Sequence, residues 1–250
     1  TDTRPDELKA QGVRPRVWFG ERWITSIFDL FEENVRYFPS LLPELSDEDP
    51  VAELAEGRTP MLPELRLHNG TIYRWNRPVY DVVDGRPHLR VENRVLPAGP
   101  TVIDMMANSA FYYGVLRPSS EDDRPLWTKM SFAAAHQNFL EAAQHGMEAR
   151  LYWPSVGEVT PDELVLRQLL PMAYQGLRSW GVSDEVSDRY LGVIEGRAKT
   201  NRNGSVWQVD TVRALQERGM TRPEALAEML RQYCARMHSN EPVHTWEITR

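Results

Sequence analysis

Hydrophobic residues recur at helical spacing near the N-terminus and again over most of the second half of the chain. In the first of these segments they form one stripe that ends at Pro39, which predicts a helix that buries the stripe. The stripe consists of Ile24, Ile27, Phe28, Phe31, Val35 and Phe38. The same periodicity predicts further helices at 101–116, 131–145, 160–180, 184–197, 205–218 and 222–238. Two of these begin with a capping box that has proline in its first turn, at 160–163 and at 221–224.

The periodicity changes between residues 65 and 96, where LRLHNGTIYRWNRPVYDVVDGRPHLRVENRVL is rich in strand-forming residues. Asn69-Gly70 and Asp84-Gly85 interrupt this segment, and both pairs are typical of tight β-hairpin turns. We therefore predict two to four antiparallel strands, with a strand at 149–153 joining the same sheet. The proline-rich stretch 39–63 predicts a surface connection with one short helix near 47–56. The predicted fold class is α+β.

Composition narrows the class of protein. The 250 residues carry 29 Lys and Arg against 36 Asp and Glu, and this net charge of -7 argues against nucleic acid or an acidic membrane as the main partner. The single cysteine, Cys234, excludes an intrachain disulfide framework and a multi-cysteine zinc site. No targeting segment and no apolar run of membrane-spanning length is found, so the cytoplasm is the expected compartment. Cys234 falls on the apolar stripe of a predicted helix and is expected to be a buried, inert thiol.

The residues that can carry chemistry gather on a strand expected at 88–95. The P-loop, the dinucleotide-binding glycine pattern, the zinc-binding H-E-x-x-H and the nucleophile elbow are all absent. Alternation puts every second side chain of a strand on one face. On this strand the ionisable residues that share a face are His88, Arg90, Glu92 and Arg94.

This face has two interpretations. It can be the wet side of an antiparallel sheet, whose charges pair across strands with little gain in stability. It can also be a polar site in which a carboxylate binds Mg²⁺ and arginines hold carboxylate or phosphate oxygens. The preceding segment favours a site, because a second strand with groups that recognise anions is expected beside the first. Those groups are His68, Arg74, Asn76 and Arg77, which lie among Tyr73 and Trp75.

Two long motifs here resemble the glutamate-cysteine ligases and their carboxylate-amine ligase relatives. They are HNGTIYRWNRPVYD (68–81) and HLRVENRVLPAGPTVIDMMANSAFYYG (88–114), which holds an E-x-R on the strand and a G-P-T at the start of the next helix. The segments VRPRVWFGERWITSIFDLFEENVRYFP (13–39) and RAKTNRNGSVWQ (197–208) resemble the actinobacterial-type branch of the family. The resemblance therefore covers most of residues 1–208.

The resemblance implies an ATP-dependent reaction of glutathione biosynthesis. The γ-carboxylate of glutamate is phosphorylated, and an amine, commonly that of cysteine, attacks the acyl phosphate. The implied fold is like that of glutamine synthetase, in which a curved antiparallel sheet forms a funnel with helices outside. By motif, Glu92 matches a glutamate that binds Mg²⁺, and Arg94 matches an arginine that contacts the transferring phosphoryl group. Arg77 matches an arginine that binds a substrate carboxylate, and His68 opens the same pattern.

The chain departs from the family pattern at two places. Many relatives have an aspartate at or near the position of Pro97, so no role of that aspartate is carried over. The family's first strands also carry metal-binding glutamates in a G-x-E-x-E type motif, and Glu21, Glu32 and Glu33 lie in the wrong context for that role. The chain, which begins with Thr1, thus resembles the C-terminal half of a ligase catalytic domain. The N-terminal half is its expected partner, and the chain alone is expected to be inactive.

Further residues are candidates that a simpler interpretation also explains. Arg16 can bind substrate or lie in a surface loop. Lys199 and Arg202 lie just before a predicted helix N-terminus, which suits an ATP phosphate or a plain turn. Arg74 and Arg90 can bind substrate or form structural ion pairs.

Two alternatives to a glutamate-cysteine ligase remain. One is a carboxylate-amine ligase with a different amine acceptor. The other is a non-catalytic binding module that keeps the ligase fold, which the missing N-terminal carboxylates favour. For either ligase the expected cofactors are ATP and Mg²⁺, and the expected substrates are glutamate and cysteine or another amine.

Overall fold

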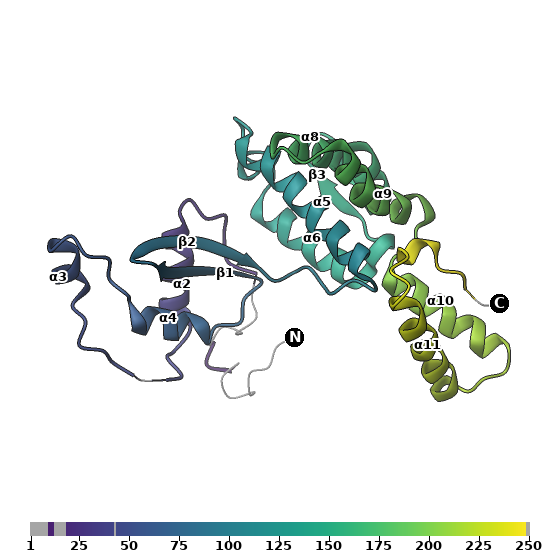
Figure 1. Cartoon of the computed structure of the whole chain (residues 1–250), viewed down its shortest axis with the longest axis horizontal. Coiled ribbons are helices and arrows are strands. Elements are labelled where there is room, and N and C mark those ends of the chain that lie inside the picture. The colour runs from purple at the N-terminus through teal and green to yellow at the C-terminus, as the bar shows by residue number, and fades with distance from the viewer. Residues whose placement is uncertain (1–9, 13–18, 43, 249–250) are drawn as a thin grey trace. The chain divides into compact units, whose positions relative to one another are not determined.

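A computed structural model describes residues 10–12, 19–42 and 44–248 (Figure 1). The chain divides into two compact units, Thr1–Leu96 and Pro97–Arg250. Each unit contains helices and a small antiparallel sheet of two strands, so the fold combines α and β structure as predicted. None of the helices in the described ranges is long and apolar enough to cross a membrane.

The first unit builds its described part from short helices and one hairpin. These elements are α2 (Ile27–Tyr37), α3 (Pro50–Ala55), α4 (Pro63–Gly70), β1 (Asn76–Val83) and β2 (Arg86–Asn93). Ser26 begins α2, because its hydroxyl accepts a hydrogen bond from the Phe28 N–H at 3.1 Å while the Asp29 carboxylate accepts from the Ser26 N–H at 3.3 Å. Asp49 caps α3 in a similar way. Both helices predicted for this region are confirmed.

The stripe predicted to be the buried face of α2 is only partly buried. Phe28 and Val35 are each 66% exposed, whereas the polar Asn34 faces the interior. The Asn34 amide donates to Oδ1 of Asn69 at 2.7 Å, and its own Oδ1 accepts from Arg74 at 3.0 Å. Because a buried polar side chain needs hydrogen-bond partners, these bonds decide which face of α2 points inward.

The prediction of a strand and a hairpin turn over residues 65–70 is wrong, because these residues form α4. Pro63 occupies the first turn of this helix, where its missing N–H breaks no hydrogen bond. Asn69 and Gly70 end the helix instead of reversing a strand. The buried Asn69 side chain bonds to Asn34 and to the carbonyl of Pro78 on β1, so tertiary contacts outweigh the local turn preference of Asn-Gly.

The β1–β2 hairpin turns at Asp84-Gly85, as predicted. Asp84 has a φ of 51° and Gly85 a φ of 72°, which is the left-handed conformation that a tight hairpin turn of this kind requires. The register sets Arg77 opposite Glu92 and Tyr80 opposite Leu89. The described part of this sheet therefore has the smallest number of strands that the sequence predicts.

The second unit is mostly helical. Its longer helices are α5 (Val102–Glu121), α6 (Phe132–His145), α8 (Leu170–Ser179), α9 (Asp184–Thr200), α10 (Gly204–Glu217) and α11 (Arg222–Met237). The helices predicted for this region are confirmed in place. One apolar core joins α5, α8 and α9 through Ala107, Ala173, Leu177 and Leu191. A second cluster contains Trp207, Val243 and Trp246.

Two details of this unit differ from the predictions. The strand expected at 149–153, β3 (Leu151–Trp153), pairs with β4 (Gly157–Val159) in a separate hairpin and does not join the β1–β2 sheet. The helix expected at 160–180 begins as α7 (Pro161–Leu164) and contains a π-helical turn at Val165–Leu169 before α8 continues. Pro171 lies two residues beyond this turn and has no N–H to donate to the carbonyl of Arg167, which agrees with the altered hydrogen bonding.

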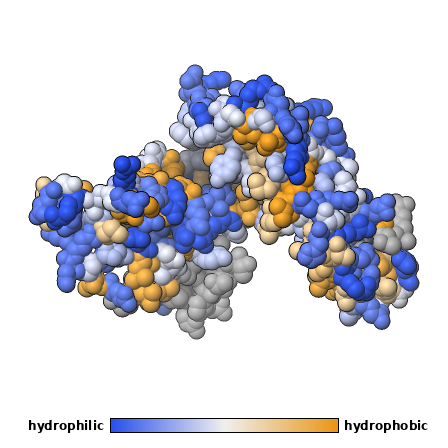
Figure 2. All heavy atoms as spheres, viewed as in Figure 1, coloured by the Kyte–Doolittle hydropathy of each residue, from blue (hydrophilic) through white to orange (hydrophobic). Residues whose placement is uncertain are grey.

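The prediction that Cys234 is buried is also wrong, because its side chain is exposed. Helix α11 packs on the Trp207 cluster through Met229 and Tyr233. One residue advances an α-helix by about 100°, so Cys234 faces away from that contact. Apolar side chains also reach the surface elsewhere in both units, as Figure 2 shows.

Helices α5 and α8 contact each other at Gly114 and Gly176, so a larger side chain there should force them apart. A Cβ atom added at Gly176 would lie 1.9 Å from the carbonyl oxygen of Gly114. We expect Gly176→Ala to lower the free energy of unfolding by about 1–3 kcal/mol, because the helices must move apart. Gly192→Ala is the matched control on α9, where no atom lies within 4 Å of the added Cβ, and should be neutral or stabilising by up to about 1 kcal/mol. Urea unfolding followed by circular dichroism measures both, and equal losses would contradict the close contact.

Candidate functional site

The candidate site lies on the face of the hairpin that carries the ionisable side chains. The register places Arg77 of β1 directly opposite Glu92 of β2, and Arg90 lies two residues before Glu92. Because side chains alternate along a strand, these three share one face. Tyr80 and Leu89 belong to the opposite face. The prediction that Arg90 and Glu92 share a face is confirmed.

Two arginines hold the carboxylate of Glu92. Arg77 contacts Oε2 of Glu92 through Nε at 2.8 Å and through Nη2 at 2.7 Å. Arg94 lies two residues further along the chain, with its Nε 3.2 Å from the same oxygen. The side chains of Arg77, Arg94 and Glu92 are 19%, 27% and 38% exposed, so water reaches the carboxylate more easily than the arginines. The three groups together carry one positive charge, which suits an anion.

The two arginines also set the protonation state of Glu92. Burial alone would raise the pKa of this carboxyl, but the close contact with Arg94 and the charges of Arg77 and Arg94 outweigh it and hold the pKa below its ordinary value. Glu92 is therefore a carboxylate at neutral pH. The stability that it contributes is present above its unfolded-state pKa and is lost as the pH falls through the lower folded-state value.

The loop between α4 and β1 positions both arginines. The backbone N–H of Arg94 donates to the carbonyl of Trp75 at 2.8 Å, and the Arg94 guanidinium lies 5.4 Å from the centroid of the Tyr73 ring. Nη1 of Arg77 donates to the carbonyl of Gly70 at 3.4 Å. Besides the carboxylate of Glu92, the Gly70 carbonyl thus holds the guanidinium group of Arg77 and the Tyr73 ring holds that of Arg94.

The structure places the other arginine candidates of this unit differently. Arg90 shares the face with Glu92, and its guanidinium contacts Nε2 of His88. Arg16 lies outside the described residues. Of the predicted site residues, the structure therefore brings Arg77, Glu92 and Arg94 into direct contact.

The prediction that His68 and Arg74 lie on a strand is wrong. His68 lies on α4, and Arg74 lies in the loop that follows it. Nε2 of His68 lies 2.7 Å from the carbonyl oxygen of Phe38. Arg74 is buried, and its guanidinium pairs with the Glu33 carboxylate at 2.7 Å. The structure thus shows the structural ion pair that was one of the two interpretations of Arg74.

Lys199 and Arg202 lie at the junction of α9 and α10. Lys199 forms an exposed ion pair with Glu195 at 2.6 Å, one turn earlier on α9. Arg202 donates to the carbonyl of Trp246 at 2.9 Å, and the Asn203 side chain caps α10. This junction has the geometry of a plain helix-to-helix turn. Arg202 also lines an open groove of about 730 Å³, but acids and bases alternate there, which gives an anion no clear preference.

The site offers one carboxylate to a magnesium ion. Within the described ranges, no group of three or more His, Cys, Asp or Glu side chains could hold a metal ion. Magnesium is commonly bound by one or two carboxylates together with substrate phosphates and water. Glu92 is ionised and partly exposed, but both arginines contact its Oε2, so only its Oε1 is available as one such ligand. The other ligands have to come from the substrate or from outside the described residues.

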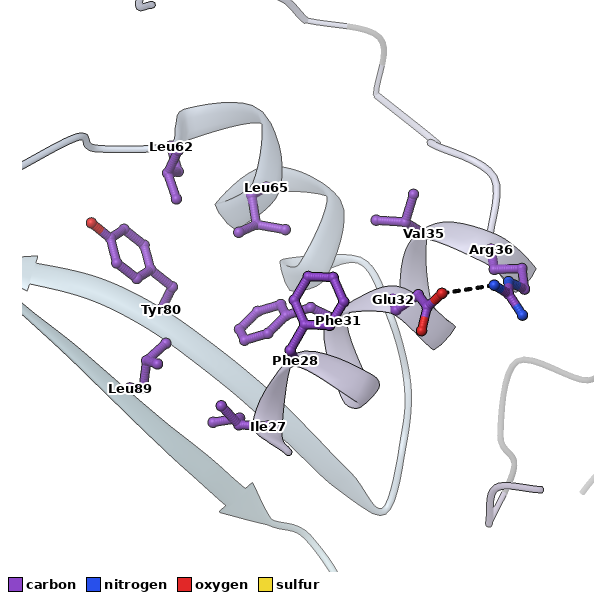
Figure 3. A pocket seen from close by; sticks show the side chains of 10 residues that line it. All are labelled: Ile27, Phe28, Phe31, Glu32, Val35, Arg36, Leu62, Leu65, Tyr80 and Leu89. Carbon is purple, nitrogen blue, oxygen red and sulfur yellow. Dashed lines mark hydrogen bonds and ion pairs between the residues drawn. The ribbon is translucent and has the colours of Figure 1, made fainter. Parts of the chain in front are cut away.

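The opposite face of the hairpin forms one wall of an apolar groove of about 690 Å³, which the sequence did not indicate. Figure 3 shows Ile27, Phe28 and Phe31 of α2 and Leu65 of α4 pointing into it. An ion pair of Glu32 with Arg36 at 2.7 Å lies at its rim. The apolar stripe of α2 was the only sequence feature that pointed to this groove. Such a stripe predicts that its side chains are buried, and it does not predict an open groove beside them.

Comparisons with known proteins give no relative for this chain: no family model, no curated protein and no solved structure matches it. The geometry of the site and the motifs that contain it are therefore the only support for a function.

Proposed function

We propose that this chain is part of an ATP-dependent carboxylate-amine ligase that joins the γ-carboxylate of glutamate to an amine, with cysteine as the favoured acceptor. The observation that carries the proposal is the carboxylate of Glu92 held between Arg77 and Arg94 on one face of the hairpin. These residues lie inside the two long motifs that resemble the glutamate-cysteine ligases.

The reaction has two steps in which atoms and charges balance. An oxygen of the glutamate γ-carboxylate attacks the terminal phosphorus of ATP, which releases ADP and leaves γ-glutamyl phosphate. The amine nitrogen then attacks the acyl carbon, phosphate leaves, and the nitrogen loses a proton to give the amide. Both steps develop charge on phosphoryl oxygens, and positioned cations are the main means of catalysing such transfers.

The residues of the hairpin have separate roles in this proposal. Arg94 binds oxygens of the phosphoryl group, and Arg77 binds a carboxylate of the substrate with its planar pair of donors. Glu92 keeps both guanidinium groups on one side of the sheet and supplies an ionised oxygen for Mg²⁺. When bound, Mg²⁺ neutralises negative charge on the phosphates of ATP. Arg90 and His88 lie further along the same face and can widen the anion-binding surface.

The proposal includes a partner for this chain. We infer that the N-terminal half of the same ligase supplies further strands and metal-binding carboxylates, which would complete a funnel-shaped sheet like that of glutamine synthetase. Two observations support this inference: among the described residues no third strand pairs with β1 or β2, and Leu89 is exposed. A ligase that uses ATP and a reduced cysteine belongs in the cytoplasm, which is the compartment we propose.

The test is phosphate release from ATP and Mg²⁺ by the full-length protein, with glutamate and with or without cysteine. We expect release to need both amino acids, and Glu92→Gln to slow it by about 100-fold or more, which is typical for the loss of one positioned electrostatic group. Glu53→Gln is the matched control, because Glu53 lies in the same unit in a surface ion pair with Arg58 and should leave the rate unchanged. Circular dichroism of each variant shows whether it is folded.

Each other outcome selects one of the alternatives. Release that needs glutamate and ignores cysteine would identify a carboxylate-amine ligase for another acceptor, and a screen of amines would find it. If no amine supports turnover and folded Glu92→Gln binds ATP like the unchanged protein, the catalytic proposal fails. The non-catalytic binding module would then replace it.

A further inference from the structure

The last described residues of the chain, 240–248, form what we call the C-terminal strap. Oδ1 of Asn240 accepts a hydrogen bond from the Ile103 N–H at 2.9 Å, in the first turn of α5. The Val243 N–H lies 3.3 and 3.2 Å from the two carboxylate oxygens of Asp104. Arg202 donates to the carbonyl of Trp246 at 2.9 Å. The strap thus joins α5 to the α9–α10 junction.

Aromatic contacts hold the strap in place. The Trp246 side chain is buried, and its ring lies edge-on to Trp207 of α10 with the centroids 5.1 Å apart. Tyr233 of α11 lies against the same ring at 5.6 Å. Val243 is fully buried beside them. Closure of the strap therefore rests on apolar burial at two positions and on polar contacts to backbone groups.

His244 lies between these two apolar positions in surroundings that disfavour a proton. Its ring packs so closely on Gly196 that an added Cβ there would lie 2.3 Å from Nε2. Its Nδ1 is buried and has no hydrogen-bond partner among the described residues. The charged groups that act on the ring are Arg197 of α9, Arg202 of the α9–α10 junction and Asp104 of α5. Two of them are positive.

The carboxylate of Asp104 cannot fully compensate the positive charges of Arg197 and Arg202 at the His244 ring. Asp104 is completely buried and already pairs with Arg197 at 2.6 Å. Burial, together with the charge of Arg197, lowers the pKa of His244 below its ordinary value of 6.5, and Asp104 opposes this shift without reversing it. A histidine released into water returns to about 6.5. The closed strap therefore binds fewer protons than the open strap.

We propose that the C-terminal strap is a proton-operated latch, closed on α5 while His244 is neutral and released when His244 takes up a proton. The free energy of closure has its full value above about pH 6.5 and decreases as the pH falls below that value towards the pKa of the closed state. Release removes the strap from Asp104 and from the Ile103 N–H, so the beginning of α5 loses two of its contacts. The strap can open locally while the rest of the second unit stays folded.

Hydrogen-deuterium exchange of the whole chain between pH 7.5 and pH 5.5 tests this proposal. Once corrected for the intrinsic pH dependence of exchange, protection of amides in residues 240–248 should fall by up to about tenfold over this range, because one proton with a free pKa of about 6.5 is taken up. Amides of α8, at the core of the same unit, should stay more strongly protected than the strap at both pH values, because they exchange only through a larger opening. His244→Gln should make strap protection independent of pH. His145→Gln is the matched control, because His145 is exposed at the end of α6, and it should keep the tenfold fall.

Two results would overturn the latch. One is strap protection that does not change with pH in the unchanged protein, and the other is the same fall in His244→Gln. Should His244→Gln fail to fold, an NMR titration of the His244 imidazole in the unchanged protein decides instead. A pKa clearly below 6.5 supports the latch, and a pKa at or above 6.5 removes its driving force.

Discussion

Replacing Asp104 with alanine is expected to lower the free energy of unfolding of the second unit by about 3–5 kcal/mol. Asp104 is completely buried, and its carboxylate pairs with Arg197 at 2.6 Å and accepts from the Thr101 hydroxyl at 2.7 Å. The side chain of Arg197 is only 14% exposed, so alanine at position 104 leaves a buried positive charge without its counter-ion. The Val243 N–H loses its acceptor as well.

Urea unfolding followed by circular dichroism measures the loss. Asp210→Ala is the control, because Asp210 pairs with Arg213 on the surface of α10 and should change the free energy by less than about 1 kcal/mol. Adding Arg197→Met to Asp104→Ala should recover part of the loss, since a buried pair removed as a whole costs less than one charge left alone. Similar losses in Asp104→Ala and Asp210→Ala would show that the buried pair contributes no more than a surface pair.

Local patterns predicted most elements of this fold, and their failures have physical causes. Asp84-Gly85 predicts a hairpin correctly because both residues need a left-handed backbone that few other residues adopt. Asn69-Gly70 carries the same local preference but ends a helix, because the Asn69 side chain is buried against α2 and β1. Such long-range contacts are invisible in a single sequence. The buried face of α2 was not predicted for the same reason, because it contains the polar residue Asn34.

The sequence also predicted the candidate site only in part. That Glu92 and Arg94 are neighbours follows from their spacing of two residues in an extended segment, although β2 itself ends at Asn93. That Arg77 meets them depends on the hairpin register, which the turn position sets once the strands are known. Arg74, three residues from Arg77, had the same sequence signal but lies in a buried ion pair. Residue type and spacing therefore could not separate the arginine that faces the carboxylate of Glu92 from the one that joins the α4–β1 loop to α2.

Replacing Arg74 with methionine tests that distinction between a structural and a substrate-binding arginine. The Arg74 side chain is 3% exposed and pairs with Glu33, which is 13% exposed. Methionine keeps much of the apolar length of arginine but leaves the Glu33 carboxylate and the Asn34 amide oxygen without this donor. We expect the free energy of unfolding of the first unit to fall by about 3 kcal/mol, at the lower end of the range for a broken buried pair, because Glu33 keeps some contact with water.

The control for Arg74→Met is Arg36→Met on α2, where the pair with Glu32 is exposed and should contribute less than about 1 kcal/mol. Glu33→Gln combined with Arg74→Met should be more stable than Arg74→Met alone, because no unpaired charge is then buried. Equilibrium unfolding in urea compares the three variants. If Arg74→Met unfolds like the unchanged protein while glutamate binding weakens, Arg74 is a substrate-binding residue. If stability falls as expected, Arg74 is a structural arginine, and Arg77 and Arg94 remain the arginines that we propose for anion binding on this unit.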